Sequence, residues 1–126
     1  LVENENASTK VFGINVENLI INSKDEIVVD SVEVINLNLY TENNKVLVTK
    51  DKIDKAVIET KYNTNIIVDE TKVTSMHMTT DSGSIYAKII GDKNEYQVNF
   101  GENEAKVQEK QITAISNTGQ VEVKFI

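Results

Sequence analysis

Carboxylates are the most numerous side chains in this sequence that can do chemistry. The chain carries 20 Asp and Glu residues against 13 Lys and Arg. A repeat in the sequence brings Asp51, Asp69, Glu70 and Glu109 to one side of the molecule, where they would form an acidic strip. Such a strip can bind Ca²⁺ weakly through several oxygen ligands, supply an acid pair that cleaves polysaccharide, or lie in solvent. Further acids of the same kind are Asp54, Asp81 and Asp92.

The sequence around these acids favours the solvent-exposed interpretation. It contains no Asp-x-Asp-x-Asp-Gly loop and no Gly-rich calcium repeat, which are sequence signs of a dedicated Ca²⁺ site. The repeat is also shorter and more regular than the coils of large β-helical enzymes. We therefore predict no catalytic residue, no cofactor-binding residue and no metal ligand, and we expect a protein that is not an enzyme.

Composition removes most nucleophilic and metal chemistry. Cysteine is absent, so disulfides, thiolate metal sites and cysteine nucleophiles are excluded together. His77 is the only histidine and lies between Met76 and Met78. If the methionines face a core, alternation along a strand turns His77 to solvent. We predict neither a His-centred triad nor a zinc site of several histidines.

Tyrosines offer a second kind of contact surface. Tyr40 and Tyr62 flank successive polar turns, and Tyr86 lies on an outward face; Tyr96 is the fourth. Exposed aromatic rings on a flat β face can stack on sugar rings or contact a protein partner. A polysaccharide-binding domain is therefore an alternative to a protein-binding one.

The elements that would position these residues recur about every 20 residues. The first apolar residue after each polar turn follows steps of 19, 20, 19, 20 and 16 residues. Apolar and polar residues alternate within each repeat, which is typical of a strand with one buried face. The expected column after the turns is Ile27, Val46, Ile66, Ile85, Ala105 and Val121. The expected column before them is Leu39, Ile58, Met78 and Val98.

This periodicity predicts an all-β chain of stacked coils, a β-solenoid of about six coils. A β-sandwich is the alternative, but hairpins have no reason to keep a constant spacing. We expect a flexible lead-in over residues 1–10 and one solenoid domain over residues 11–126. The fifth repeat, Asn94–Lys110, is the least regular, because its turn at Glu102-Asn103 has no Gly and the step after it shrinks to 16.

Charge and hydropathy limit the partners. The net charge of -7 and the pI of about 4.7 argue against binding to nucleic acid, because phosphate binding needs a basic surface. The chain has no apolar run long enough to span a membrane. It begins with Leu1 rather than Met, so we expect that an export signal or anchor has been removed.

Three segments of the second half resemble a known family. They are Thr80-Asp81-Ser82-Gly83-Ser84-Ile85, Gly91-Asp92-Lys93-Asn94-Glu95-Tyr96, and the run from Asn117 to Phe125. Over residues 78–125 the chain is similar to the bacterial adhesin family of β-helical cell-envelope proteins, a domain of unknown function. The resemblance implies a right-handed, single-stranded β-helix that is exported or membrane-anchored, with Gly83 and Gly119 serving the turns. The family pattern contains no catalytic residue.

Together these observations predict a non-enzymatic, extracytoplasmic, adhesin-like module that presents a rigid face to a surface or a protein partner. The alternatives are a polysaccharide-binding or polysaccharide-cleaving β-helix domain, and a structural or sensory domain of a cell-envelope stress system. A solenoid also has open ends. We expect the polar residues 1–10 to cover one end. The other end, VEVKFI, is apolar, and we expect it to pair with another copy or to be covered by a further segment.

Overall fold

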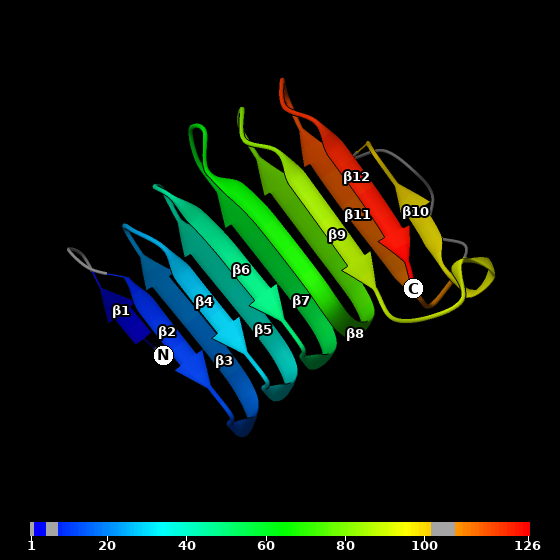
Figure 1. Cartoon of the computed structure of the whole chain (residues 1–126), viewed down its shortest axis with the longest axis horizontal. Coiled ribbons are helices and arrows are strands. Elements are labelled where there is room, and N and C mark those ends of the chain that lie inside the picture. The colour runs from blue at the N-terminus through cyan, green and yellow to red at the C-terminus, as the bar shows by residue number, and fades with distance from the viewer. Residues whose placement is uncertain (1, 5–7, 102–107) are drawn as a thin grey trace.

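The computed structural model describes residues 2–4, 8–101 and 108–126, and within them the chain is almost entirely β-strand (Figure 1). A 3₁₀ turn, η1, spans Lys93–Glu95. The first strands are β1 Val2–Asn4, β2 Thr9–Phe12, β3 Asn15–Ser23, β4 Ile27–Asp30, β5 Glu33–Thr41 and β6 Lys45–Thr49. The remaining strands are β7 Lys52–Thr60, β8 Asn65–Thr80, β9 Ile85–Ile89, β10 Gln97–Asn99, β11 Gln111–Ser116 and β12 Val121–Phe125.

The strands form two faces of one parallel coil. Sheet A consists, in order, of β1, β3, β5, β7, the second half of β8, β11 and β10. Sheet B consists of β2, β4, β6, the first half of β8, β9 and β12. The chain runs along a strand of sheet B, turns a tight corner into sheet A, and returns through a polar tip to the next strand of sheet B. This is the β-solenoid that the sequence predicts, and every strand pair among the described residues is parallel, which excludes a hairpin sandwich.

The in-register stack confirms the apolar columns over most of the chain. Ile27 pairs with Val46, Val46 with Ile66, and Ile66 with Ile85, and Val121 follows as the partner of Ile85. The first four of these side chains are fully buried between the two sheets. Each such residue therefore covers its neighbours above and below at the strand spacing of about 4.8 Å, and burial of apolar surface holds successive coils together.

Three successive tips are closed by buried threonines, Thr41, Thr60 and Thr80. The Thr41 hydroxyl donates to the Asp25 carbonyl at 2.6 Å, and the Thr60 and Thr80 hydroxyls both donate to the Thr64 carbonyl at 3.0 Å. Each threonine thereby donates to a backbone carbonyl of a tip, which stabilises the tip. Thr41 and Thr60 thus stack in register, and their hydroxyl groups hydrogen-bond to the backbone rather than to each other.

Gly83 and Gly119 serve the tips by allowing close approach. A Cβ at Gly83 would lie 2.1 Å from the Thr64 carbonyl oxygen, and a Cβ at Gly119 would lie 1.9 Å from the Gly83 oxygen. Positive φ occurs in two other tips, at Asn44 and Tyr62, and at the corners between the two sheets. Gly13, Ser31, Lys50 and Glu70 occupy successive corners with φ between 46° and 61°. The corner therefore repeats the same left-handed residue even where the sequence offers no glycine.

The regular coil is interrupted after β9, which overturns the predicted fifth repeat. Val98 was expected to follow Met78 in its column, but Ala114 of β11 takes that position, and Val98 pairs with Ile112 on the far side of β11. The chain thus skips one position in sheet A, forms β10, and returns to fill the gap. The predicted turn at Glu102-Asn103 and the predicted core residue Ala105 lie outside the described residues.

The number of coils and the start of the solenoid also differ from the expectation. One turn of the coil consists of a strand of sheet B and the strand of sheet A that follows it directly. The described regular part makes about four such turns, namely β2 with β3, β4 with β5, β6 with β7, and the two halves of β8. The sequence predicted about six coils. At the other end the solenoid begins earlier than expected. β1 and the first residues of β2 fall within the range 1–10 and pair in parallel with β3 and β4.

Substituting Ala for Gly83 tests the close packing of the tips. The added Cβ meets backbone atoms that cannot move without opening the coil, so we expect a loss of about 3 kcal/mol or more in unfolding free energy. Gly13→Ala is the matched control, because open space surrounds its Cβ and only the left-handed backbone is strained, at about 1–2 kcal/mol. Urea unfolding compares the two variants. Equal losses would contradict close approach as the reason for Gly83.

Candidate binding groove

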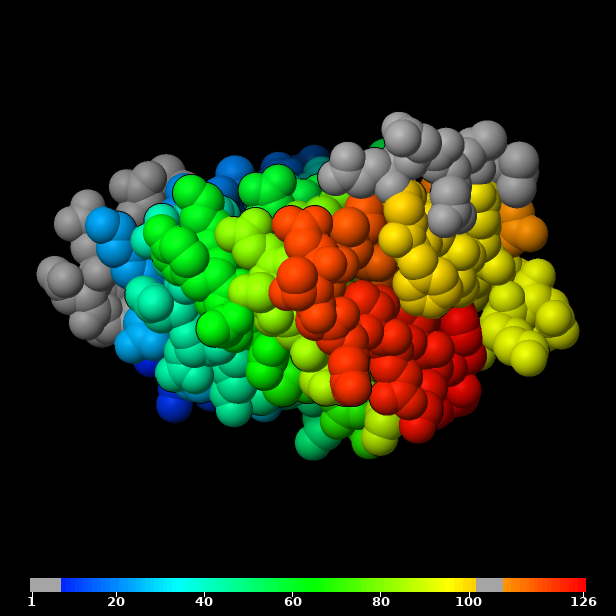
Figure 2. Space-filling view, turned by 90° about the horizontal axis from the view of Figure 1, so that it is seen from above, coloured from blue at the N-terminus to red at the C-terminus, as the bar shows by residue number. Residues whose placement is uncertain are grey.

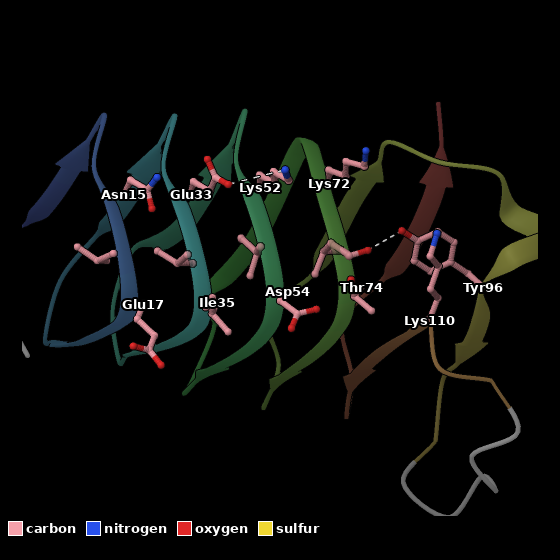
Figure 3. Close-up of a pocket in the computed structure, with 14 residues that line it drawn as sticks. Asn15, Glu17, Glu33, Ile35, Lys52, Asp54, Lys72, Thr74, Tyr96 and Lys110 are labelled. Atoms are coloured by element: carbon pink, nitrogen blue, oxygen red, sulfur yellow. Dashed lines mark hydrogen bonds and ion pairs between the residues drawn. The ribbon is translucent and has the colours of Figure 1, made fainter.

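A groove of about 620 Å³ crosses the outside of sheet A where its strands bend (Figure 3). Along β5, Val34 and Leu37 are buried, whereas Ile35 and Asn36 between them both face outward. Two consecutive outward residues break the alternation of a flat strand and bend it. The same break occurs in β3, β7 and the second half of β8, so the bends stack into one groove that runs across the strands.

Two rows of side chains line the sides of the groove, and a row of apolar residues between them, Val16, Val34, Ile53 and Val73, lines it as well. Figure 3 shows these side chains projecting from four successive strands along the groove. The first row is Asn15, Glu33, Lys52 and Lys72. The second row is Glu17, Ile35, Asp54 and Thr74. The Lys52 ammonium lies 3.7 Å from the Glu33 carboxylate, an exposed ion pair of small stabilising effect.

The charges in the groove are unevenly distributed along its length. Glu17 and Glu33 lie toward the N-terminal strands, and Lys72 and Lys110 lie toward the C-terminal end. Lys52 and Asp54 lie between them on β7. The groove is therefore negative at one end and positive at the other, and the exposed Ile35 gives it an apolar centre.

The segment inserted after β9 closes the positive end. Tyr96 follows η1 and is only 7% exposed. Its hydroxyl donates a hydrogen bond to the Val73 carbonyl, at a point where no described strand pairs with residues 72–74 on that side. Its ring packs against Phe125 with the ring centroids 5.0 Å apart. Tyr96 thus caps both an open sheet edge and the end of the core.

Lys110 holds the outer side of this closure. Its ammonium lies 2.8 Å from the Glu95 carboxylate and 5.6 Å from the centre of the Tyr96 ring. The Glu95 carboxylate raises the pKa of Lys110, and burial raises the pKa of the Tyr96 hydroxyl. Both groups therefore keep the protonation states that form these contacts at neutral pH.

The tyrosines do not form the flat platform that the alternative of a polysaccharide-binding domain would need. Tyr40 lies on the outer face of sheet A, where its hydroxyl lies 3.1 Å from the Glu42 carboxylate. Tyr62 is at a tip, Tyr86 is on the outer face of sheet B, and Tyr96 is inside the cap. Four rings at four different places do not give a flat face for a sugar chain.

The acids and the histidine are also dispersed. His77 is exposed between the buried Met76 and Met78, as alternation predicts. Asp69 is half-buried beside Thr49, while Glu70 and Glu109 are exposed. The predicted acidic strip is not formed, because Asp51 turns into the interior. Among residues 2–4, 8–101 and 108–126, no three His, Asp or Glu side chains converge as metal ligands would.

Asp51 is a buried acid at a corner of the coil. It stacks inward between Val32 and Thr71, and its Oδ1 accepts a hydrogen bond of 2.8 Å from the Val32 N–H. Within the described residues its Oδ2 has no hydrogen-bond partner. Burial raises the pKa of Asp51 to about 7, although the Val32 N–H acts in the opposite direction. This carboxyl group is therefore partly protonated near neutral pH.

Sequence reasoning did not find the groove. No motif in the sequence marks Ile35, Lys52 or Lys72 as a functional residue. The signal was present in the spacing, because two polar or exposed positions in succession recur at 17–18, 35–36, 54–55 and 74–75. The sequence pattern does not distinguish Tyr96 from the exposed tyrosines. Only the path of the inserted segment reveals that Tyr96 is buried.

Comparison of the chain with protein-family models, with curated proteins and with solved structures finds no match. None of the helical segments in the described residues is long and apolar enough to cross a membrane.

The buried Asp51 predicts a specific dependence of stability on pH. Its pKa is higher in the folded chain than in the unfolded one, so the folded state binds the proton more tightly. Unfolding free energy then falls as pH rises from about 4 to about 7, by up to about 1.4 kcal/mol per pH unit. Asp51→Asn removes this slope and is more stable than the wild type above pH 7, since an uncharged amide replaces the buried charge.

Urea unfolding across this pH range measures the effect. Asp54→Asn is the matched control, because Asp54 is exposed three positions further along the chain, and its pH profile should follow that of the wild type. A profile of Asp51→Asn that runs parallel to the wild type throughout would show that Asp51 is not the buried titrating group.

Proposed function

We propose that this chain is a non-enzymatic binding module that holds an extended segment of a protein partner in the groove on sheet A. The observation that carries the proposal is the groove itself, which crosses four in-register strands and has opposite charges at its two ends. Four strands at about 4.8 Å span about 15 Å, and this length accommodates about four or five residues of extended peptide.

The side chains in the groove favour a polypeptide over a polysaccharide. Three carboxylates and three ammonium groups line it, and they match the mixed charges and backbone groups of a peptide. Binding of sugar rings usually relies on exposed aromatic faces, but the aromatic residue here, Tyr96, is buried and its hydroxyl is engaged. Ile35, which is 49% exposed, offers an apolar contact at the centre, where binding energy tends to concentrate.

The coil supports this role mechanically. At the groove, β5 and β7 pair with neighbours on both sides, whereas β3 and β8 pair on one side. The strands therefore hold most of the two rows in place before a partner arrives. A preorganised site loses little conformational entropy on binding. The proposed location outside the cytoplasm, at the cell surface or envelope, rests on the resemblance of residues 78–125 to the adhesin family.

Selection from a phage-displayed library of random peptides tests the proposal. Peptides enriched on the wild-type chain should carry basic residues at one end and acidic residues at the other. Ile35→Glu should weaken their binding about tenfold or more, because a charge replaces the central apolar contact. Val57→Glu is the matched control, since Val57 is a β-branched residue of sheet A with 41% exposure outside the groove.

The outcomes separate the candidate functions. Loss of peptide binding in Ile35→Glu but not in Val57→Glu supports the groove. Equal effects of both variants, or no enrichment of peptides at all, would contradict it. Binding to glycans that Ile35→Glu leaves unchanged, or release of reducing ends from a polysaccharide, would favour the alternative classes instead.

A further inference from the structure

The two ends of the solenoid have complementary half-strands at their edges. At the N-terminal end, the described residues of β1 pair with Ile21–Ser23, the three residues of β3 nearest the tip. At the C-terminal end, β10 pairs only with Gln111–Thr113, the half of β11 farthest from the tip. Each end of sheet A therefore has a step, and the two steps face in opposite directions along the coil axis (Figure 1).

The register shows how these steps fit together. Ile21 and Ala114 belong to one column, through Leu39, Ile58 and Met78. The β1 strand of a second copy, continued in the same register, would lie on Ala114–Ser116. That position is directly beside β10. The two short strands would then share one layer of sheet A without overlapping.

From these edges we propose that the chain stacks end to end with a second copy of itself, with β12 of one copy pairing in parallel with β2 of the next. Continuing the column of Val121, Ile85, Ile66, Val46, Ile27 and Thr9 places β12 and β2 in the same register as every internal pair of sheet B. Among the described residues, β12 pairs only with β9 and β2 only with β4, so the joint would give each of them a second strand partner.

The side chains at this joint are complementary. Val123 would meet Val11, and both are half-buried apolar residues at their ends of the core. One position earlier, Glu122 would meet Lys10, and both are exposed. Opposite charges directly across two strands attract, whereas like charges repel. Glu122 also lies 2.9 Å from Lys124 on its own strand, so Lys10 would add a second cation beside it.

The strands of sheet A at the two ends are complementary as well. The outer edge of β10 would meet the half of the next copy's β3 that β1 leaves uncovered, with Val98 next to Leu19. This extends the inward column of Leu19, Leu37, Ala56, Met76, Ile112 and Val98. The half-buried Val98 and Leu19 of the next copy would each gain the second neighbour that the inner members of the column have. Figure 2 shows the segment containing β10 beside β12 at one end of the molecule, so both sheets contribute to the same joint.

A head-to-tail joint of this kind does not close on itself, so it predicts an open series of oligomers. Sedimentation velocity of the full chain over a range of concentrations should show a mass that keeps rising without a fixed stoichiometry. Val11→Glu blocks one end and Val123→Glu blocks the other, and each variant alone should stay monomeric. Mixed together, they should form a one-to-one dimer and nothing larger, because only one compatible pair of ends remains.

Charge variants provide a second test that does not touch the core. Lys10→Glu and Glu122→Lys should each weaken association about threefold to tenfold at low salt, and the double swap should recover most of the loss. Circular dichroism confirms that each variant is folded. A wild-type chain that stays monomeric at millimolar concentration would overturn the proposal, as would a closed dimer, or association that the blocking variants leave unchanged.

Discussion

The in-register stacking of buried apolar residues is the interaction on which the rest of this structure depends. Each coil of two strands has too little surface to bury a core alone, and it becomes stable by covering the same column of side chains in its neighbours. The fully buried Ile66 lies between Val46 and Ile85 in this way. The corners, the threonine tips and the bends of sheet A all inherit their alignment from these columns. A feature that occurs once per coil therefore becomes a continuous ridge or groove on the surface.

The regular part of the fold could be predicted from the sequence because it repeats. The column from Ile27 to Ile85 and the outward direction of His77 follow from a period near 20 and an alternation of 2. The fifth repeat could not be predicted this way. Val98 lies at an apolar position of the right spacing, but the chain places β10 beyond β11 and leaves the position beside Met78 to Ala114. The local alternation of apolar and polar residues predicts which residues face inward. The order of the strands depends on tertiary contacts such as those of Tyr96.

In the candidate site, too, some features follow from the sequence pattern and others only from the folded structure. Asp51 occupies a corner position that reads as exposed, yet the left-handed Lys50 before it turns the carboxylate into the core. A binary pattern of polar and apolar residues carries no information about such a turn. The groove depends on two successive outward residues in each of four strands. That signal is visible in the sequence only after the coils have been aligned, because one break in alternation is common and four in register are not.

Disulfide formation between engineered cysteines tests the central claim most directly, and the absence of native cysteine leaves no competing thiol. Neighbours in parallel strands lie within the distance that a disulfide can bridge. The structure pairs His77 with Thr113, whereas an uninterrupted repeat would pair His77 with Gln97. The variant with cysteines at 77 and 113 should oxidise readily to an intramolecular bond detected by mass spectrometry, and the variant with cysteines at 77 and 97 should not. The reverse result would contradict the strand order that closes this solenoid.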